Sequence, residues 1–302
     1  MRIGKMIDPY TAAGTFAGTV KRMTRWRKSP GTIEERKQFF KRDYWVDYPR
    51  ATELLNRFDD MYAAEGQVRP EGMLVTGPPN NGKTSTAFKF MRDRLAGYQK
   101  VDGRPDAPPI IKAETPPGAP SPRSLYMALL QEVGAPYNPR SAEQVLYNQV
   151  IQLFTESGVR MLILDEIHNG LAGGPNQQRI MLNTLKSLSN TLQISIVMIG
   201  TDDARVMFER DDQIKSRFPA FEMPAWEFSE EYAQLVDDMF GAMELGIPSP
   251  ASDYDFVDEL HQLSGGLMGK TKKLVAEAAC ASINSPSKNL EKSILRHCTR
   301  PA

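Results

Sequence analysis

The sequence predicts an α/β fold, in which a parallel central sheet carries a phosphate-binding loop and a small all-helical domain follows. Three observations predict it. A glycine-rich run ending in Gly82-Lys83-Thr84 lies between an apolar strand and a helix. A second apolar strand ends in Asp165-Glu166. After Trp226 the apolar residues recur at helical spacing, and only turn residues interrupt them.

Length and composition fit a large domain joined to a smaller one. The chain has 302 residues, of which 41% are hydrophobic and 25% charged, and its formal net charge is zero. Cys280 and Cys298 show no metal-ligand spacing, which favours reduced thiols. An apolar run of bilayer length and a secretory segment are both missing, so we expect a cytoplasmic protein.

Residues 1–48 form a basic N-terminal arm. Lysine and arginine are concentrated between Lys21 and Arg42, and Trp26, Phe39 and Phe40 interleave with them. Such a segment can bind a nucleic-acid backbone, or it can dock on a neighbouring subunit. The composition favours neither role over the other.

A helix that starts at Tyr48-Pro49 opens the next domain, which we expect to span 49–225. Leu54, Leu55, Phe58 and Met61 share one of its faces. In nucleotide-binding folds, a helix at this position often carries residues that contact the base of the nucleotide. Packing against the sheet is the simpler explanation of this apolar stripe, and we favour it.

The loop after the first strand has the G-x-x-x-x-G-K-[ST] pattern. Its glycines let backbone N–H groups point into one concavity, where the following helix N-terminus adds positive potential for phosphate oxygens. Lys83 is expected to reach the β- and γ-phosphates of ATP, and the Thr84 hydroxyl is expected to bind Mg²⁺. A surface turn is the alternative, but the flanking strand and helix argue against it. The predicted nucleotide contacts here are Gly77, Pro78, Pro79, Asn80, Asn81, Gly82, Lys83, Thr84 and Ser85.

Two proline-rich loops flank a second strand at Pro109–Ala113, and a helix follows from Arg123. Basic residues lie in and around these loops. They are candidates for DNA backbone contacts if the loops line a channel, although each alone could equally be a solvated surface charge. The candidates are Lys100, Arg104, Lys112 and Arg123.

The apolar strand at 159–164, which comes third along the chain, has the pattern of a central parallel strand covered on both faces. Its two terminal carboxylates form a Walker-B arrangement. Asp165 is expected to bind Mg²⁺, directly or through water, and Glu166 to activate the water that attacks the γ-phosphate. His168 more often packs or hydrogen-bonds in such a place than catalyses. The preceding helix, 142–157, is expected to bury Val145, Leu146, Val150, Ile151 and Phe154.

Three later features resemble AAA+ ATPases. Thr201 follows the strand at 194–200, where these enzymes place a polar sensor-1 residue that orients the attacking water. Ser216-Arg217-Phe218 resembles their arginine-finger segment, in which Arg217 would act on a neighbouring subunit's nucleotide; an ordinary surface arginine is the alternative. Residues 226–302 would form the helical lid, with Lys270 as the sensor-2 residue that contacts the nucleotide, and Lys273 as second choice.

Together these motifs resemble the TniB/TnsC family of AAA+ transposition regulators. The similarity extends from about Trp45 to Trp226 and is most specific in Asn80-Asn81-Gly82-Lys83 and in Asp165-Glu166-Ile167-His168-Asn169. The resemblance implies an ATP- and Mg²⁺-dependent ATPase that assembles as rings or filaments on double-stranded DNA. It further implies that the protein links a target-selector protein of the TniQ/TnsD type to a transposase during DNA integration, and that hydrolysis disassembles it.

Other functions share parts of this pattern. A helicase or clamp loader would have the same ATP motifs and differ in its partner. A scaffold that binds ATP as an assembly switch would hydrolyse it negligibly, which the Asp165-Glu166 pair disfavours. A signalling NTPase without nucleic acid is disfavoured by the basic arm.

Overall fold

The computed structural model describes residues 32, 34–35, 37–38, 44–64, 69–99, 107–117, 121–209, 212–243, 249–283 and 295. The chain divides into two compact units, which are described separately. One unit comprises residues 49–224, and the other comprises 1–48 together with 225–302. Most of the basic arm lies outside the described residues, as do Lys100, Arg104 and Cys298.

The unit 49–224 is built on a five-stranded parallel sheet in the order β2-β3-β4-β1-β5. Every residue of β1, β3 and β4 is buried, as expected for strands covered on both faces. In a parallel sheet the carboxyl ends of all strands share one edge, and ligands bind at that edge. The strands are β1 (Gly72–Thr76), β2 (Ile110–Glu114), β3 (Met161–Asp165), β4 (Ser195–Ile199) and β5 (Ala220–Glu222).

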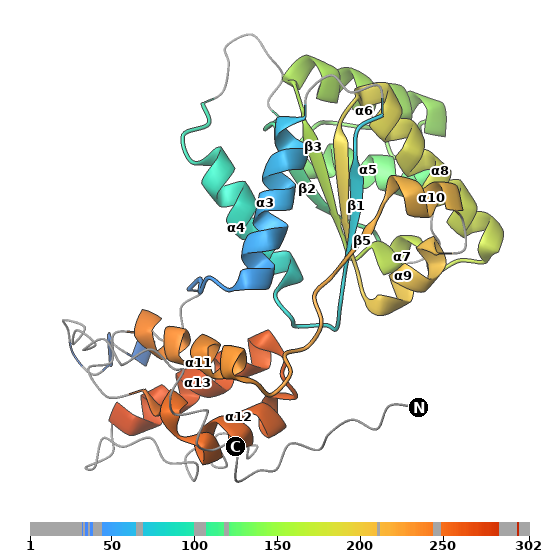
Figure 1. Ribbon diagram of the computed structural model, residues 1–302. Coiled ribbons are helices and arrows are strands. Elements are labelled where there is room, and N and C mark those ends of the chain that lie inside the picture. Colours follow the sequence, from blue (N-terminus) through green and yellow to red (C-terminus); the bar gives the residue numbers. More distant parts are fainter. Residues whose placement is uncertain are drawn as a thin grey trace, which may run out of the picture. The chain divides into compact units, whose positions relative to one another are not determined.

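Helices cover both faces of this sheet (Figure 1). On one face lie α3 (Pro49–Ala63) and α4 (Lys83–Leu95), which contact each other. On the other lie α5 (Pro122–Glu132), α6 (Glu143–Ser157) and α8 (Pro175–Leu192). Three short helices complete the unit: α7 (Ile167–Gly170), α9 (Asp202–Phe208) and α10 (Asp212–Arg217).

Most of the apolar residues predicted to face the core are buried, while Leu55 and Ile151 are only partly buried and Val145 is exposed. Leu54, Phe58 and Met61 of α3 are buried, as are Leu146, Val150 and Phe154 of α6. Val145 is 54% exposed, so its placement on the inner face of α6 was wrong. It immediately precedes Leu146, and adjacent residues of a helix point about 100° apart, so only one of the pair faces the sheet.

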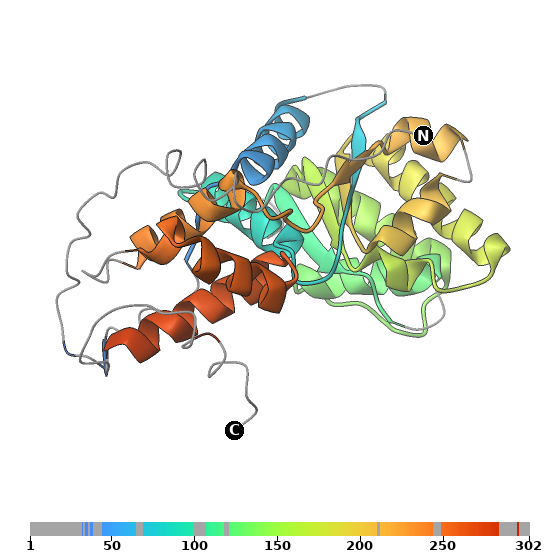
Figure 2. The same ribbon diagram turned by 60° about the horizontal axis from the view of Figure 1, so that its bottom comes forward.

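The regular elements that the structure describes in the other unit are helices. It contains α11 (Glu230–Ala242), the short 3₁₀ helix η1 (Pro250–Ser252), α12 (Tyr254–Ser264) and α13 (Met268–Ile283), drawn from orange to red in Figure 2. The buried Tyr232 hydroxyl joins these helices, because it lies 3.2 Å from Ser264 Oγ and 3.0 Å from Thr271 Oγ1. Burial raises the pKa of Tyr232, since the phenolate would lose its hydration.

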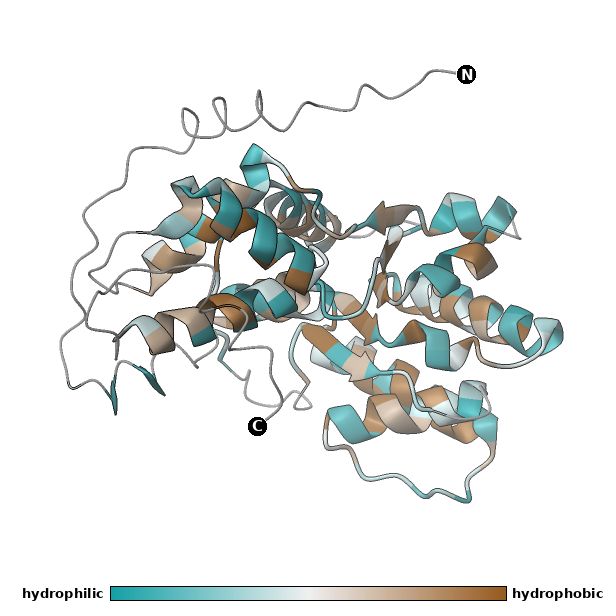
Figure 3. Cartoon of the chain, turned by 90° about the horizontal axis from the view of Figure 1, so that it is seen from below, coloured by the Kyte–Doolittle hydropathy of each residue, from teal (hydrophilic) through white to brown (hydrophobic). Residues whose placement is uncertain are grey.

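The helices alternate hydrophilic and hydrophobic residues along their length (Figure 3). This pattern is typical of helices that bury one face and expose the other to water. Within the part of the chain that the structure describes, every helix is too short or too polar to cross a lipid bilayer.

Candidate functional site

Residues 77–84, the predicted phosphate-binding loop, have the backbone geometry that their glycines predict. Gly77 and Gly82 adopt φ angles of 148° and 87°, and Asn80 adopts 61°. A side chain at Gly77 would place its Cβ 2.1 Å from the Met223 carbonyl oxygen, so only glycine fits there. Asn80 is in the left-handed region, which asparagine tolerates better than most residues. The loop then enters α4 at Lys83.

The loop lines a cavity of about 510 Å³, a volume suited to a small-molecule ligand. The opposite wall comes from the carboxyl ends of β3 and β4. Gly77 and Pro78, which we also predicted as nucleotide contacts, are not among the lining residues. The lining residues are Pro79, Asn80, Asn81, Gly82, Lys83, Thr84, Ser85, Asp165, Glu166, His168, Ile199, Gly200 and Thr201.

Lys83 is held within the loop. Its ammonium donates to the carbonyl oxygens of Gly77 and Pro78, at 2.8 Å each, and the residue is 8% exposed. Burial lowers the pKa of Lys83, because the ammonium loses water, and the carboxylates of Asp202, Glu166 and Asp165 oppose this shift. Neutral carbonyls are weaker partners for an ammonium than phosphate oxygens, so Lys83 is poised to bind an anion in the cavity.

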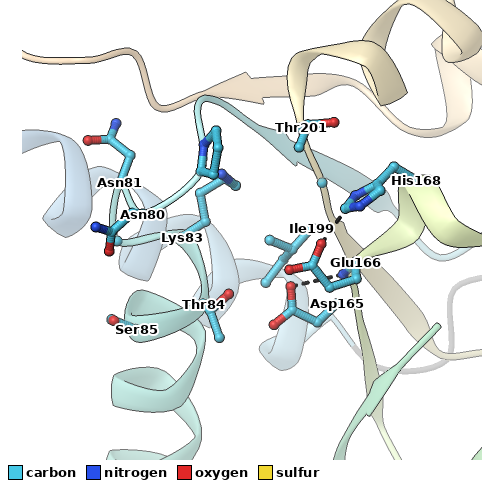
Figure 4. A pocket seen from close by; sticks show the side chains of 13 residues that line it. Asn80, Asn81, Lys83, Thr84, Ser85, Asp165, Glu166, His168, Ile199 and Thr201 are labelled. Atoms are coloured by element: carbon cyan, nitrogen blue, oxygen red, sulfur yellow. Dashed lines mark hydrogen bonds and ion pairs between the residues drawn. The ribbon is translucent and has the colours of Figure 1, made fainter. Parts of the chain in front are cut away.

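The two carboxylates of the β3 end have different surroundings. Asp165 is 3% exposed, and its Oδ1 accepts the backbone N–H of Glu166 at 3.0 Å. Glu166 adopts a φ of 54°, and its Oε2 lies 3.2 Å from His168 Nδ1. A left-handed glutamate is strained, and such strain is characteristic of active sites. Figure 4 shows both carboxylates on one side of the cavity, across from Lys83 and Thr84.

Thr84 and Asp165 fit a magnesium site. Mg²⁺ takes oxygen ligands, keeps several waters, and is held by one or two protein groups plus substrate phosphates. Both residues line the same cavity, and Figure 4 shows their side chains facing each other. The Asp165 carboxylate already faces a positive charge, that of Lys112. Among the described residues no group of three or more His, Cys, Asp or Glu side chains could hold a metal.

Lys112 corrects one sequence-based prediction. It was a candidate DNA contact, but it is 8% exposed and its Nζ lies 3.1 Å from Asp165 Oδ2. Its Nζ also lies 4.8 Å from the centre of the Phe88 ring, a cation–π contact. Residue 112 pairs with Ile163 in the sheet register, so it shares a face of the sheet with Asp165, two residues further on. Lys112 is therefore a buried partner of Asp165 and is not available at the surface.

We expect the Lys112→Ala substitution to lower the free energy of unfolding by about 3–5 kcal/mol, because it leaves the Asp165 carboxylate buried without its counter-ion. Chemical denaturation of both proteins measures the difference. Lys273→Ala is the control, since Lys273 is 75% exposed and its ion pair should contribute less than about 1 kcal/mol. Equal effects of the two substitutions would contradict the buried pair.

The other predicted residues have the following positions. Thr201 lines the cavity and precedes α9. Arg217, at the end of α10, is not among the lining residues; its guanidinium donates to Ser189 Oγ at 3.0 Å and to Asn190 Oδ1 at 2.6 Å. Lys270 is exposed in the first turn of α13 and belongs to the other unit. Arg123 donates to the backbone carbonyl of Ser141 at 2.8 Å and to that of Pro139, and its DNA contact stays a prediction.

Sequence reasoning missed two features of the site. His168 lines the cavity beside Glu166, and Lys112 supports Asp165 from the neighbouring strand. The second had a signal in the sequence, namely a lysine inside the apolar run 110–113. A buried charge requires a partner, so this lysine predicts a nearby carboxylate without identifying which one.

Comparison with known protein families gives a match over most of the chain. The family model described as bacterial TniB protein matches residues 36–228. No curated protein sequence matches the chain.

Solved structures that resemble the chain share its fold at low sequence identity. The Cdc6p structure from Pyrobaculum aerophilum has a TM-score of 0.61 at 14% identity, covering 87% of this chain and 70% of that one. The Aeropyrum pernix ORC2 protein in ADPNP–ADP complexes has a TM-score of 0.59 at 14% identity, with coverages of 86% and 70%. The Aeropyrum pernix ORC1 protein in complex with DNA has 0.57 at 16% identity, with coverages of 87% and 68%. The fold is thus the α/β fold of AAA+ ATPases.

Proposed function

The chain belongs to the bacterial TniB family, and from this premise we propose that it is an ATP- and Mg²⁺-dependent ATPase that assembles on double-stranded DNA. In this role it regulates transposition. One observation carries the proposal: Lys83 and Thr84 of the phosphate-binding loop face Asp165 and Glu166 across a single cavity. A triphosphate bound by the loop would present its terminal phosphate to the carboxylates.

Binding of ATP would use the loop and the start of α4. Backbone N–H groups of a glycine-rich loop and the N-terminal end of the helix that follows it favour phosphate oxygens. Lys83 would exchange two carbonyl partners for β- and γ-phosphate oxygens, which bear full negative charge. Gly77, Pro78, Pro79, Asn80, Asn81, Gly82 and Ser85 would shape this loop around the phosphates.

Hydrolysis would use the end of β3. The Glu166 carboxylate would accept a proton from the attacking water, and Thr201 would help to orient that water. Thr84 and Asp165 would hold Mg²⁺, which when bound neutralises charge on the β- and γ-phosphates. Lys112 forms an ion pair with Asp165 and would hold that carboxylate in place on the sheet.

Arg217 and Lys270 would make turnover depend on assembly. Arg217 lies away from the cavity of its own chain, as expected for a residue that acts on the nucleotide of a neighbouring copy. Burial lowers the pKa of Arg217, and the charge of Arg69 lowers it further, so an anion beside this guanidinium would be favoured. Lys270 would contact the nucleotide as the sensor-2 residue. We therefore propose slow hydrolysis that an adjoining copy stimulates.

The partners follow from the family. We propose that copies of the chain form a ring or filament on duplex DNA, which connects a target selector of the TniQ/TnsD type to a transposase. Arg123 and the basic arm are candidates for phosphate contacts, together with Lys100 and Arg104. Membership of the TniB family supports the link to transposition. The DNA-bound ORC1 neighbour supports only the suitability of this fold for DNA binding.

We expect Lys83→Ala to weaken ATP binding by at least about 100-fold, because the loop loses its only cationic side chain, and to abolish nucleotide-dependent DNA binding. Titration with a fluorescent ATP analogue, and fluorescence anisotropy of a labelled duplex with and without nucleotide, measure the two effects. Lys89→Ala is the matched control on α4, where Lys89 pairs with Asp93 at the surface. Unchanged ATP affinity in Lys83→Ala would refute the phosphate site.

A further inference from the structure

Asn81 lies in the phosphate-binding loop, but its side chain binds elsewhere. Its Nδ2 donates to the carbonyl oxygens of Met223 and Pro224, at 2.8 and 2.7 Å. The residue is 3% exposed, and Figure 4 shows its amide directed away from Lys83 and Thr84. A primary amide has two N–H donors, and here each can serve one of two successive carbonyls. The side chain thus joins the loop to the segment after β5.

Met223 and Pro224, here called the connector, are the last residues of the unit 49–224. The chain passes from them directly to Ala225, where the helical unit resumes. Proline has a fixed φ and restricts the residue before it, so the connector has little freedom to absorb a displacement. A displacement of Met223 would therefore be transmitted through Pro224 to Ala225.

Two further contacts join the connector to the phosphate-binding loop. The Met223 N–H donates to the carbonyl of Thr76, the residue before the loop, at 2.8 Å. Gly77 packs so closely on Met223 that a methyl group in place of its hydrogen would lie 2.1 Å from the Met223 oxygen. The connector is therefore contacted by Thr76 at the end of β1 and by Gly77 and Asn81 of the loop.

The second passage of the chain between the units is attached at the same place. Residues 48 and 49 form this passage, and the next residue, Arg50, donates through Nε to the Glu222 carbonyl at 2.8 Å. The Arg50 guanidinium also lies 3.9 Å from the centre of the Phe221 ring. Residues next to both passages of the chain are thus hydrogen-bonded at the end of β1 or β5, Met223 to Thr76 and Arg50 to Glu222.

We propose that Asn81 is a positioning residue that couples nucleotide occupancy of the phosphate-binding loop to the connector, and through it to the helical unit. The proposal rests on the nucleotide site proposed above. When phosphates order residues 80–82, the two Asn81 hydrogen bonds carry that ordering to Met223 and Pro224. Without the amide, the loop would still bind phosphate through its backbone and Lys83, but the connector would not respond.

The test uses hydrogen exchange of the full chain, with and without adenylyl imidodiphosphate and Mg²⁺. In the wild type we expect the nucleotide to slow exchange of the Met223 amide by at least about 10-fold, because its bond to Thr76 opens less often. In Asn81→Ala, at nucleotide concentrations that saturate the site, we expect no slowing of exchange at the connector. Asn80→Gly is the neighbouring control; its φ of 61° suits glycine, and it should retain the connector response.

Two results would overturn the proposal. Undiminished slowing at Met223 in Asn81→Ala would show that the amide does not couple the sites. A loss of nucleotide affinity above about 100-fold in a folded Asn81→Ala protein would make Asn81 a direct ligand instead. Asn81→Thr keeps a single donor and should give an intermediate response. If Asn81→Ala does not fold, this variant decides the question, and a full wild-type response in it would refute the proposal.

The nucleotide site itself is tested separately by the same data. If the wild type binds no nucleotide, the proposed function fails. If the wild type binds nucleotide and assembles on DNA, and Asn81→Ala also responds fully at the connector, only the coupling role fails.

Discussion

Arg217→Ala is expected to lower the rate of DNA-stimulated ATP hydrolysis by about 10³–10⁵-fold, the range that an arginine finger contributes in other NTPases. Arg217 hydrogen-bonds to Asn190 and Ser189 and is not among the residues that line the cavity of its own chain. We propose that the guanidinium of an adjoining copy stabilises the charge that builds up on the γ-phosphate. Phosphate release from purified protein with duplex DNA measures the loss.

Mixing variants tests the trans arrangement. Arg217→Ala retains an intact phosphate-binding loop, and Lys83→Ala retains an intact Arg217, so each supplies what the other lacks. In a random equal mixture up to about a quarter of the head-to-tail interfaces would be productive, and the rate should recover to at most that share. Lys215→Ala is the control, because Lys215 is an exposed cation on the same short helix, α10. No recovery in the mixture would contradict a finger supplied by a neighbour.

Glu166→Gln is expected to reduce hydrolysis by about 10²–10⁴-fold while ATP affinity changes little. The substitution keeps the shape of the side chain and removes the base that would accept the proton from water. Because Glu166 lines the cavity beside His168 and is half exposed, its loss should cost little stability. Single-turnover hydrolysis and ATP titration separate the two effects. Assemblies formed with ATP should then persist as long as those formed with a non-hydrolysable analogue.

A neighbouring carboxylate provides the control for this experiment. Glu114 pairs with Asp165 in the sheet register, one strand away, but it is exposed and does not line the cavity. Glu114→Gln should hydrolyse ATP at nearly the wild-type rate. Normal hydrolysis by Glu166→Gln would assign the proton transfer to another group.

The fold was largely predictable from the sequence, because its strongest signals are local. The apolar runs at 73–75, 159–164 and 194–199 became β1, β3 and β4. Such runs must be buried on both faces, and that requirement alone predicts central parallel strands. The short helices α7 and α10 were not predicted, since helices of four and six residues have no apolar period to detect.

The candidate site was predictable where a motif fixes the backbone and unpredictable where side chains meet across the fold. Lys83, Thr84, Asp165 and Glu166 line one cavity, as their motifs indicate. The pairing of Lys112 with Asp165 depends on the register of β2 against β3, which the sequence does not specify. The hydrogen bonds from Asn81 to Met223 and Pro224 join residues that are 142 and 143 positions apart in the sequence. They likewise depend on the order of the strands in the sheet.

In the proposed function, ATP holds neighbouring copies of the chain together on a duplex. Sedimentation of the purified protein with duplex DNA, Mg²⁺ and adenylyl imidodiphosphate measures this most directly. We predict particles that contain several copies per duplex, and their dissociation when ADP replaces the analogue. A single copy per duplex under these conditions, or an assembly indifferent to nucleotide, would contradict the account.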